Sequence, residues 1–196
     1  IFVNDGSKDQ SLDKLIALKK KHPDDNIKII DLSRNFGQVS AIYAGYENTE
    51  SKCVINISAD MQDPPELMCD MLNEYFNNGT PIVIGNRASR EEGVFRRFTS
   101  KIFYYLMRKM SFENMPRGGF DYVLLGSEVK NELLKTKDAN PFWQGQILWT
   151  GFDIKLMPYH RLKRHSGDSK WTFSKKLTYL IDGVLGYSFL PLRLIS

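Results

Sequence analysis

Three side chains that could bind a metal ion follow a stretch predicted to be a buried strand. The strand is predicted over 53–58, a short and largely apolar run. Asp60, Gln62 and Asp63 come next, and a pair of prolines then ends the strand and favours the start of a helix. Ligands of α/β sheets bind beyond the carboxyl ends of the strands, and closely spaced oxygen ligands there suit Mg²⁺ or Mn²⁺ carrying a diphosphate. The alternative is a solvated acidic turn that caps a helix.

Two earlier turns also follow predicted strands and carry polar side chains. Asp5 stands between a strand over 1–4 and the turn Gly6-Ser7, which brings its carboxylate to the carboxyl edge of the sheet. Arg34-Asn35-Phe36-Gly37 follows a strand over 27–32, and the next helix offers free N–H groups and a positive dipole end. The alternatives are a turn that caps the next helix for Asp5, and a plain strand-to-helix turn for the second segment.

Basic residues are concentrated in the carboxyl-terminal part of the chain. The segment 161–176 holds six Lys and Arg against one Asp, so its charge of +5 leaves −1 for the rest of the chain. Such a cluster suits phosphate or an anionic membrane surface. Nucleic acid is the competing interpretation, but the segment matches no nucleic-acid motif and the remaining chain is close to neutral. We therefore expect no nucleic-acid partner.

Strand and helix patterns alternate along the first half of the chain. Strands are predicted over 1–4, 27–32, 53–58 and 81–85, and helices over 12–21, 39–46 and 64–77. This order favours a mostly parallel sheet covered by helices. In the first helix, Leu12, Leu15, Ile16 and Leu18 are expected to face inward.

A different helical pattern begins at Val94. Its apolar residues recur at helical spacing and basic residues occupy much of the remaining surface. The pattern fits a helix that packs on the sheet, and the basic, aromatic-rich face also suits contact with lipid headgroups.

Length and composition favour one globular domain over 1–196, because 196 residues with 42% hydrophobic content can form a substantial core. Cys53 and Cys69 are expected to be free thiols in a reducing compartment. No apolar run reaches the roughly 20 residues that a membrane span needs. The chain starts inside a predicted strand and ends in an apolar segment, so both ends look cut.

Four motifs in order resemble the family 2 glycosyltransferases, and among them the polyprenyl-phosphate glycosyltransferases related to dolichyl-phosphate mannose synthase. They are Val3-Asn4-Asp5-Gly6-Ser7, Arg34-Asn35-Phe36-Gly37, the run 58–66, and Arg164 to Trp171. The resemblance covers nearly the whole chain, and it implies a first strand before residue 1 and a membrane region truncated after about 184–196. It implies an α/β fold of the GT-A nucleotide-sugar type, with a mostly parallel, Rossmann-like sheet flanked by helices.

The resemblance also implies a donor side for the site. The residues expected to bind the nucleotide or donor are Asp5, Arg34, Asn35, Gly37, Ser58 and Asp60. The metal ligands expected are Asp60, Gln62 and Asp63, holding Mg²⁺ or Mn²⁺. The family usually has Asp-x-Asp-x-Gln at this turn, and the first aspartate is Ser58 here. Serine is a weaker ligand than a carboxylate, so we expect lower cation affinity unless Asp63 compensates.

On the acceptor side, Asp121 aligns with the family's catalytic aspartate after Gly118-Gly119-Phe120. The arginine usual two residues later is Val123 here, and an aspartate that merely begins a strand is the alternative. The residues expected to meet phosphate or acceptor are Arg87, Arg97, Arg164, Ser169 and Lys170. The last three match a loop that closes over the diphosphate in the family.

The function implied is inverting transfer of a sugar from a UDP- or GDP-sugar to a polyprenyl phosphate such as undecaprenyl or dolichyl phosphate. The expected location is the cytoplasmic face of the plasma membrane. The alternatives are a relative that uses a saccharide hydroxyl as acceptor, and a non-catalytic nucleotide-sugar-binding relative, which Ser58 motivates. The assembly state, including a homo-oligomer, is left open.

Overall fold

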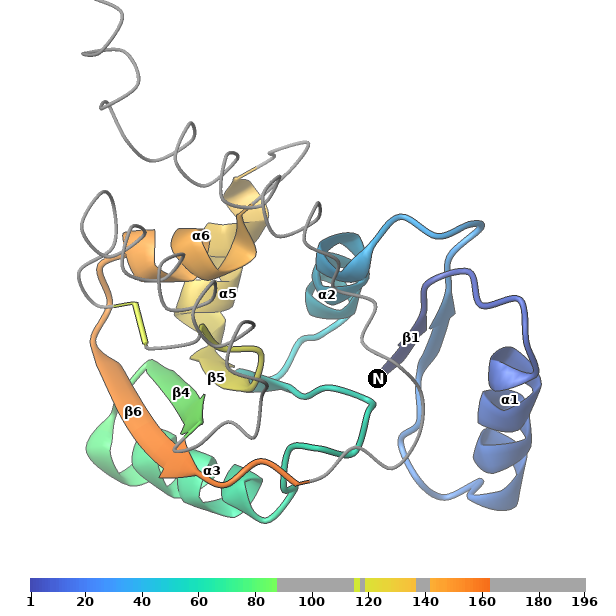
Figure 1. Cartoon of the computed structure of the whole chain (residues 1–196), viewed down its shortest axis with the longest axis horizontal. Helices are drawn as coiled ribbons and strands as arrows, with labels where there is room; N and C mark the ends of the chain where they lie inside the picture. Colours follow the sequence, from blue (N-terminus) through green and yellow to red (C-terminus); the bar gives the residue numbers. More distant parts are fainter. Residues whose placement is uncertain (88–114, 117–118, 137–141, 163–196) are drawn as a thin grey trace, which may run out of the picture. The chain divides into compact units, whose positions relative to one another are not determined.

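The computed structural model describes residues 1–87, 115–116, 119–136 and 142–162 (Figure 1). Six predictions therefore lie outside the described residues: the helix after Val94, Arg97, Arg164, Ser169, Lys170 and the membrane region at about 184–196. The chain divides into two compact units, 1–51 and 52–196, which are treated separately below. The expectation of a single domain over 1–196 stays a prediction.

The first unit is a parallel two-stranded sheet with two helices. Its elements are β1 (Phe2–Asn4), α1 (Ser11–Lys21), β2 (Ile29–Asp31) and α2 (Gln38–Glu47). Val3 pairs with Ile30 in the centre of the sheet, α1 contacts both strands, and α2 contacts β1. Three lysines in the last turn of α1 face the negative end of its dipole, which favours the helix.

The prediction that four residues of α1 face inward is wrong for two of them. Leu12 and Leu15 are half-buried, whereas Ile16 and Leu18 are 40% and 37% exposed. Leu12 and Leu15 lie at the centre of the helix face toward the sheet, and the other two lie on its flanks. Because the described sheet has only two strands, it is too narrow to cover those flanks.

The second unit contains a four-stranded sheet and three helices among the described residues. Its elements are β3 (Cys53–Asn56), α3 (Leu67–Asn78), β4 (Ile82–Arg87), β5 (Val123–Gly126), α5 (Ser127–Lys135), α6 (Trp143–Trp149) and β6 (Ile154–Tyr159). The strand order is β3-β5-β4-β6. β5 is antiparallel to both of its neighbours, and β4 and β6 are parallel, so β5 alone runs against the other three strands.

The centre of this sheet is its most buried part. Val83 of β4 and Leu124 of β5 pair with each other and pack with Met71 of α3. Side chains alternate across a strand, so Ile82 and Val123 project from the opposite face. Figure 1 shows α3 on one side of these strands and the α5–α6 pair on the other. The sheet is therefore covered by helices on both faces, which confirms the α/β class.

The predicted elements between 1 and 87 all form, with ends within three residues of the prediction. The largest shift is the start of α3, which begins at Leu67 rather than Pro64. The carbonyl groups of Pro64, Pro65 and Glu66 each accept a hydrogen bond from the N–H three residues later. The prolines therefore form a tighter turn that leads into α3.

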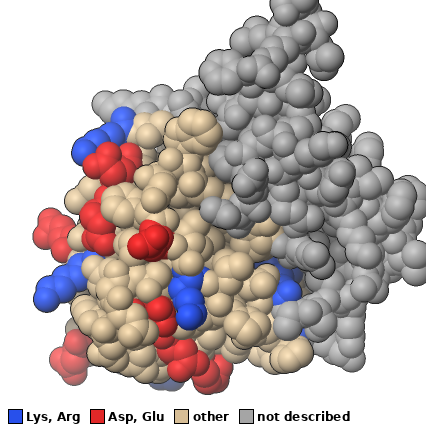
Figure 2. All heavy atoms as spheres, turned by 90° about the vertical axis from the view of Figure 1, so that its left-hand side faces the viewer, with Lys and Arg blue, Asp and Glu red and all other residues tan. Residues whose placement is uncertain are grey.

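Two surface properties bear on the sequence predictions. None of the helices in the described ranges is long and apolar enough to cross a bilayer. On the face seen in Figure 2, the described Lys and Arg side chains are interspersed with Asp and Glu. The described part of that face thus carries no extended patch of one charge, in line with the near-neutral charge outside 161–176.

Candidate functional site

In the first unit, Asp5 holds the loop after β2 in place. Its carboxylate accepts hydrogen bonds from the backbone N–H groups of Phe36 (2.7 Å) and Gly37 (3.0 Å) and from Asn35 Nδ2 (2.9 Å). β1 and β2 are parallel neighbours, so their carboxyl ends lie at one edge and bring the two segments together. The two predicted nucleotide-binding segments of this unit therefore form one cluster.

A close backbone approach completes this cluster. Gly6 has φ of 63°, and a Cβ atom there would lie 2.5 Å from the Arg34 carbonyl carbon and the Asn35 nitrogen. Only glycine fits this position. Arg34 places its guanidinium carbon 4.1 Å from the centre of the Phe36 ring, which is 46% exposed. Direct contact of Asp5, Arg34, Asn35 or Gly37 with a nucleotide stays a prediction, because the contacts seen are within the loop.

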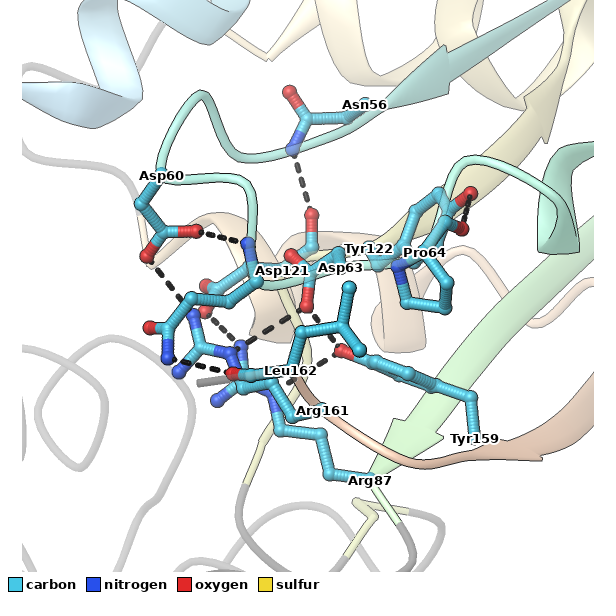
Figure 3. Close-up of polar contacts among 11 residues, drawn as sticks. Asn56, Asp60, Asp63, Pro64, Arg87, Asp121, Tyr122, Tyr159, Arg161 and Leu162 are labelled. Atoms are coloured by element: carbon cyan, nitrogen blue, oxygen red, sulfur yellow. Dashed lines mark hydrogen bonds and ion pairs between the residues drawn. The ribbon is translucent and has the colours of Figure 1, made fainter. Parts of the chain in front are cut away.

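In the second unit, polar side chains from four strand ends converge at one edge of the sheet (Figure 3). Asp60 follows β3, Arg87 ends β4, and Arg161 follows β6. Asp121 instead precedes β5. Because β5 runs opposite to its neighbours, its amino-terminal end lies at their carboxyl edge, so Asp121 joins the same cluster.

The turn after β3 is fixed to the segment after β6. Asp60 Oδ2 lies 3.2 Å from Arg161 Nη2, and Asp60 Oδ1 accepts the backbone N–H of Gln62. Gln62 Nε2 donates to the Leu162 carbonyl (3.0 Å), and the Leu162 N–H donates to the Gln62 carbonyl (2.8 Å). Met61, which lies between Asp60 and Gln62 in the chain, has a positive φ of 56° and is 73% exposed. These hydrogen bonds give the turn a defined shape.

Asp63 directly follows Gln62 in the chain and belongs to a buried polar group. Its side chain has no exposed surface, and its Oδ1 accepts a 2.5 Å hydrogen bond from the Tyr159 hydroxyl. Arg161 Nε lies 3.5 Å from the same oxygen. Burial and the bond to Asp63 raise the pKa of Tyr159 to about 12. Burial and the negative charge of Asp63 raise the pKa of Tyr122 to about 12 as well.

Arg87 connects this buried group to Asp121. Its Nη2 lies 2.7 Å from Asp121 Oδ2, and its Nε donates to the Tyr159 hydroxyl (3.3 Å). The Arg87 side chain is 6% exposed and that of Asp121 is 33% exposed. Burial alone would lower the pKa of Arg87, but the Asp121 charge and the Tyr159 hydroxyl outweigh it and raise that pKa. Asn56 Nδ2 also donates to the Asp121 carbonyl (2.7 Å).

The expected role of Arg87 is not the one seen here. We expected its guanidinium to meet phosphate, and in the structure it is buried and bonded to Asp121 and Tyr159. This contact makes Arg87 a positioning residue for Asp121. Contact with phosphate, like the catalytic role of Asp121, stays a prediction.

The metal site predicted from the sequence fits the structure through Asp60. Within the described residues, no three His, Cys, Asp or Glu side chains come together as a metal cage. A cation bound mainly by a diphosphate needs only one or two protein carboxylates, and Asp60 at a partly exposed turn meets that need. Ser58, two positions before Asp60, is half-buried. Gln62 donates through its amide nitrogen, so its amide oxygen is a further atom that suits a cation. Asp63 does not fit the compensating role, because its carboxylate is fully buried against Tyr159.

Sequence reasoning missed the roles of Tyr159 and Arg161. Arg161 was counted only as part of the basic cluster, and Tyr159 was not considered. Both depend on β6, for which no strand was predicted. The signal available was the short run of mostly apolar residues from Ile154 to Tyr159.

Comparison with known proteins gives the family. The sequence model of glycosyl transferase family 2 matches residues 1–131. The chain belongs to glycosyltransferase family 2. It is similar to the uncharacterized glycosyltransferase YkcC of Bacillus subtilis, at 37% identity over the whole chain and 60% of that protein. It is also similar to the bactoprenol glucosyl transferase of Shigella phage SfX, at 31% identity over 98% of this chain and 63% of that protein.

The chain thus spans about 60% of the length of the curated relatives it matches. Among solved structures, it is similar to TarS residues 1–349 of Staphylococcus aureus in complex with UDP-GlcNAc, with a TM-score of 0.60 at 12% identity, over 94% of this chain and 57% of that chain. It is also similar to the mannosyltransferase PcManGT of Pyrobaculum calidifontis in complex with GDP-Man and Mn²⁺, with a TM-score of 0.58 at 12% identity, over 85% of this chain and 48% of that chain. These likenesses confirm the GT-A fold.

Proposed function

We propose that this family 2 chain is the catalytic part of an inverting glycosyltransferase that moves a sugar from a nucleotide-diphosphate sugar to a polyprenyl phosphate. The observation that carries the proposal is that one network of ion pairs and hydrogen bonds links Asp60 to Asp121 through Arg161, Asp63, Tyr159 and Arg87 (Figure 3). The similarity to bactoprenol glucosyl transferases over 98% of the chain supports the lipid acceptor. UDP- and GDP-sugars are both donors to consider, because structural neighbours bind one or the other.

Each carboxylate has a separate part in this reaction. The acceptor oxygen attacks the anomeric carbon, the bond from that carbon to the diphosphate breaks, and the electron pair leaves with the nucleoside diphosphate. A divalent cation held by Asp60 would stabilise the negative charge of that leaving group. A phosphomonoester has a second pKa of about 6, so a lipid phosphate is already ionised and needs little help from a base. Asp121, partly exposed and fixed by Arg87, then positions the acceptor or the sugar.

A saccharide hydroxyl is the rival acceptor. Its proton must leave during the attack, which calls for a general base within reach. The one-third exposure of Asp121 makes this carboxylate available for that role. The two acceptor classes therefore assign different tasks to the same residue.

A donor-turnover assay with the full-length protein tests the proposal. The donors are UDP-glucose, UDP-GlcNAc and GDP-mannose, each with Mn²⁺, Mg²⁺ or EDTA, and release of nucleoside diphosphate is measured with and without undecaprenyl phosphate. We expect turnover that depends on the lipid phosphate and on a divalent cation, and that is lost in Asp60→Asn. Turnover that requires an oligosaccharide instead would favour the hydroxyl acceptor. Nucleotide binding without turnover under any condition would favour a non-catalytic relative.

We further propose that the whole protein acts at the cytoplasmic face of the plasma membrane. The basic segment 161–176 supports this location through its suitability for anionic headgroups. Cross-linking of the membrane-bound protein would test whether it forms a homo-oligomer.

A further inference from the structure

Arg161 is shared between two carboxylates of different kinds. Its Nη2 lies 3.2 Å from Asp60 Oδ2, and its Nε lies 3.5 Å from Asp63 Oδ1. Asp60 is at a partly exposed turn with a 20% exposed side chain, whereas Asp63 has no exposed surface. The planar fork of arginine allows one side chain to serve both oxygens. One positive charge thus offsets two negative charges here.

The other described cation of this cluster is already engaged. Arg87 is bonded to Asp121 and Tyr159. Asp63 Oδ2 is buried without a hydrogen-bond partner in the described part of the chain, so this aspartate depends on Tyr159 and Arg161. Arg161 is therefore the described cation that pairs with both Asp60 and Asp63.

The contact between Arg161 and Asp60 is at the atom that a metal ion would need. A divalent cation on Asp60 Oδ2 competes with the Arg161 guanidinium for that oxygen, because two positive groups repel each other at close range. A metal ion that arrives alone therefore loses part of its binding free energy to the displacement. A metal ion that arrives with a diphosphate brings negative charge, to which the displaced guanidinium can turn.

The backbone around Arg161 keeps the displaced side chain near the site. Leu162 and Gln62 exchange two hydrogen bonds, one to each backbone carbonyl. Residue 161 is thereby fixed beside the turn that carries Asp60. Release of the Asp60 contact moves the side chain and leaves its attachment point in place, so the guanidinium stays within reach of a ligand at that turn.

We propose that Arg161 is a resident counter-ion of Asp60 that a metal–diphosphate complex displaces, and that this exchange adds to the cooperativity between metal and nucleotide binding. The proposal rests on the proposed function, since it requires Asp60 to be the metal ligand. Coupling between two ligands through a protein is reciprocal, so each ligand should strengthen binding of the other by the same factor. Arg161 is in this sense a positioning residue for the donor.

The test is Mn²⁺ binding to the full-length protein, measured as free Mn²⁺ by electron paramagnetic resonance, with and without UDP or GDP. In the unsubstituted protein we expect weak binding of Mn²⁺ alone and at least fivefold tighter binding with the nucleotide, the low end of typical coupling. In Arg161→Gln we expect Mn²⁺ alone to bind at least fivefold tighter and the gain from the nucleotide to shrink by a similar factor, while the part of the gain that comes from direct coordination of Mn²⁺ by the diphosphate remains. Arg161→Lys, which keeps the charge without the fork, should lie between the two.

Two further variants make the outcome specific. Lys155→Gln removes one positive charge from an exposed position of β6 and should leave Mn²⁺ binding unchanged. Unchanged or weaker binding of Mn²⁺ alone in both Arg161 variants, with unfolding curves that show intact folding, overturns the role of Arg161. Asp60→Asn separates the two proposals: if this variant binds Mn²⁺ normally, the metal site of the proposed function fails. If Asp60→Asn abolishes binding while Arg161→Gln changes nothing, only the counter-ion role fails.

Discussion

Arg87 Nη2 lies 2.7 Å from Asp121 Oδ2, and this ion pair joins the end of β4 to the residue that precedes β5 by two positions. The arginine is nearly buried and the aspartate is partly exposed. The buried partner therefore orients the exposed one. Through Tyr159, the same arginine also connects Asp121 with Asp63 below the Asp60 turn.

Arg87→Met should lower stability and turnover together. Loss of one partner of a buried ion pair costs about 3–5 kcal/mol, and the exposure of Asp121 should reduce this to about 2 kcal/mol. Urea unfolding measures the first effect. In the donor-turnover assay, kcat should fall while the KM for the nucleotide sugar stays within about twofold, because Arg87 does not touch the Asp60 turn in the structure.

Arg87→Lys is the matched variant for this prediction. It keeps the positive charge but replaces the fork by a single ammonium, so it should recover much of the stability and less of kcat. Equal recovery of both would mean that charge alone matters. A large rise in the KM for the donor would instead return Arg87 to the phosphate-binding role predicted from the sequence.

Tyr159→Phe should destabilise the cluster because it leaves Asp63 without its hydroxyl donor. An unsatisfied buried group costs about 1–3 kcal/mol, more when it is charged. The control is Tyr75→Phe, which removes an exposed bond to the Lys52 carbonyl (2.9 Å) and should change the free energy of unfolding by much less. Equal effects of the two substitutions in urea unfolding would contradict a special role for the buried contact.

Alkaline pH should weaken the fold through the same tyrosine. Tyr159 has a pKa of about 12 in the folded chain, above the usual value of 10. Between pH 10 and pH 12 the folded state keeps the Tyr159 proton that the unfolded state has lost. The contribution of Tyr159 to the free energy of unfolding is therefore fully present below pH 10 and is lost as the pH rises toward 12. Urea unfolding at pH 8, 10 and 11.5 should show this loss. The pKa values of Tyr122, Tyr75 and Cys53 are raised as well, so part of the slope should remain in Tyr159→Phe.

Ser58→Asp tests the departure of this turn from the usual family motif. If Ser58 faces the cation held by Asp60, a second carboxylate should tighten Mn²⁺ binding in the presence of nucleotide by about tenfold or more, since ligand charge tunes cation affinity. Ser58→Asn, which adds a neutral side chain of similar size, is the control. If neither variant binds Mn²⁺ more tightly than the unsubstituted protein, residue 58 does not face the metal.

Asp121 was expected from the family resemblance, whereas the site residues expected from local pattern are those that follow a recognisable strand. Asp60 and Gln62 come within six residues of the end of β3, and Asp5 directly follows β1, so a local pattern was enough to place them. The direction of β5 was not predictable in this way. An apolar run from Val123 to Leu125 indicates a strand but not which way it pairs.

The partners of these residues depend on contacts across long stretches of chain. Tyr159 and Asp63 are 96 positions apart, and Arg161 and Asp60 are 101 apart. Which arginine meets which carboxylate is set by strand order, and a single sequence does not contain that order. The contacts of Arg87 with Asp121 and of Arg161 with Asp60 are therefore not predictable from the local pattern.

The last prediction concerns Gly6 in the turn after β1, which has a positive φ and lies close to the backbone of a neighbouring segment. Gly6→Ala must bear both the positive φ of 63° and a Cβ at 2.5 Å from the backbone of Arg34 and Asn35. Gly79→Ala has a similar φ of 70° but no atom within 4 Å, so it should cost only the conformational term of about 1–2 kcal/mol. Gly6→Ala should cost clearly more, and it should also weaken UDP or GDP binding, because the clash pushes away the loop that Asp5 holds. Calorimetric titration and urea unfolding of the two variants check both effects. Nucleotide affinity equal to that of the unsubstituted protein would show that the 34–37 loop does not shape the nucleotide site.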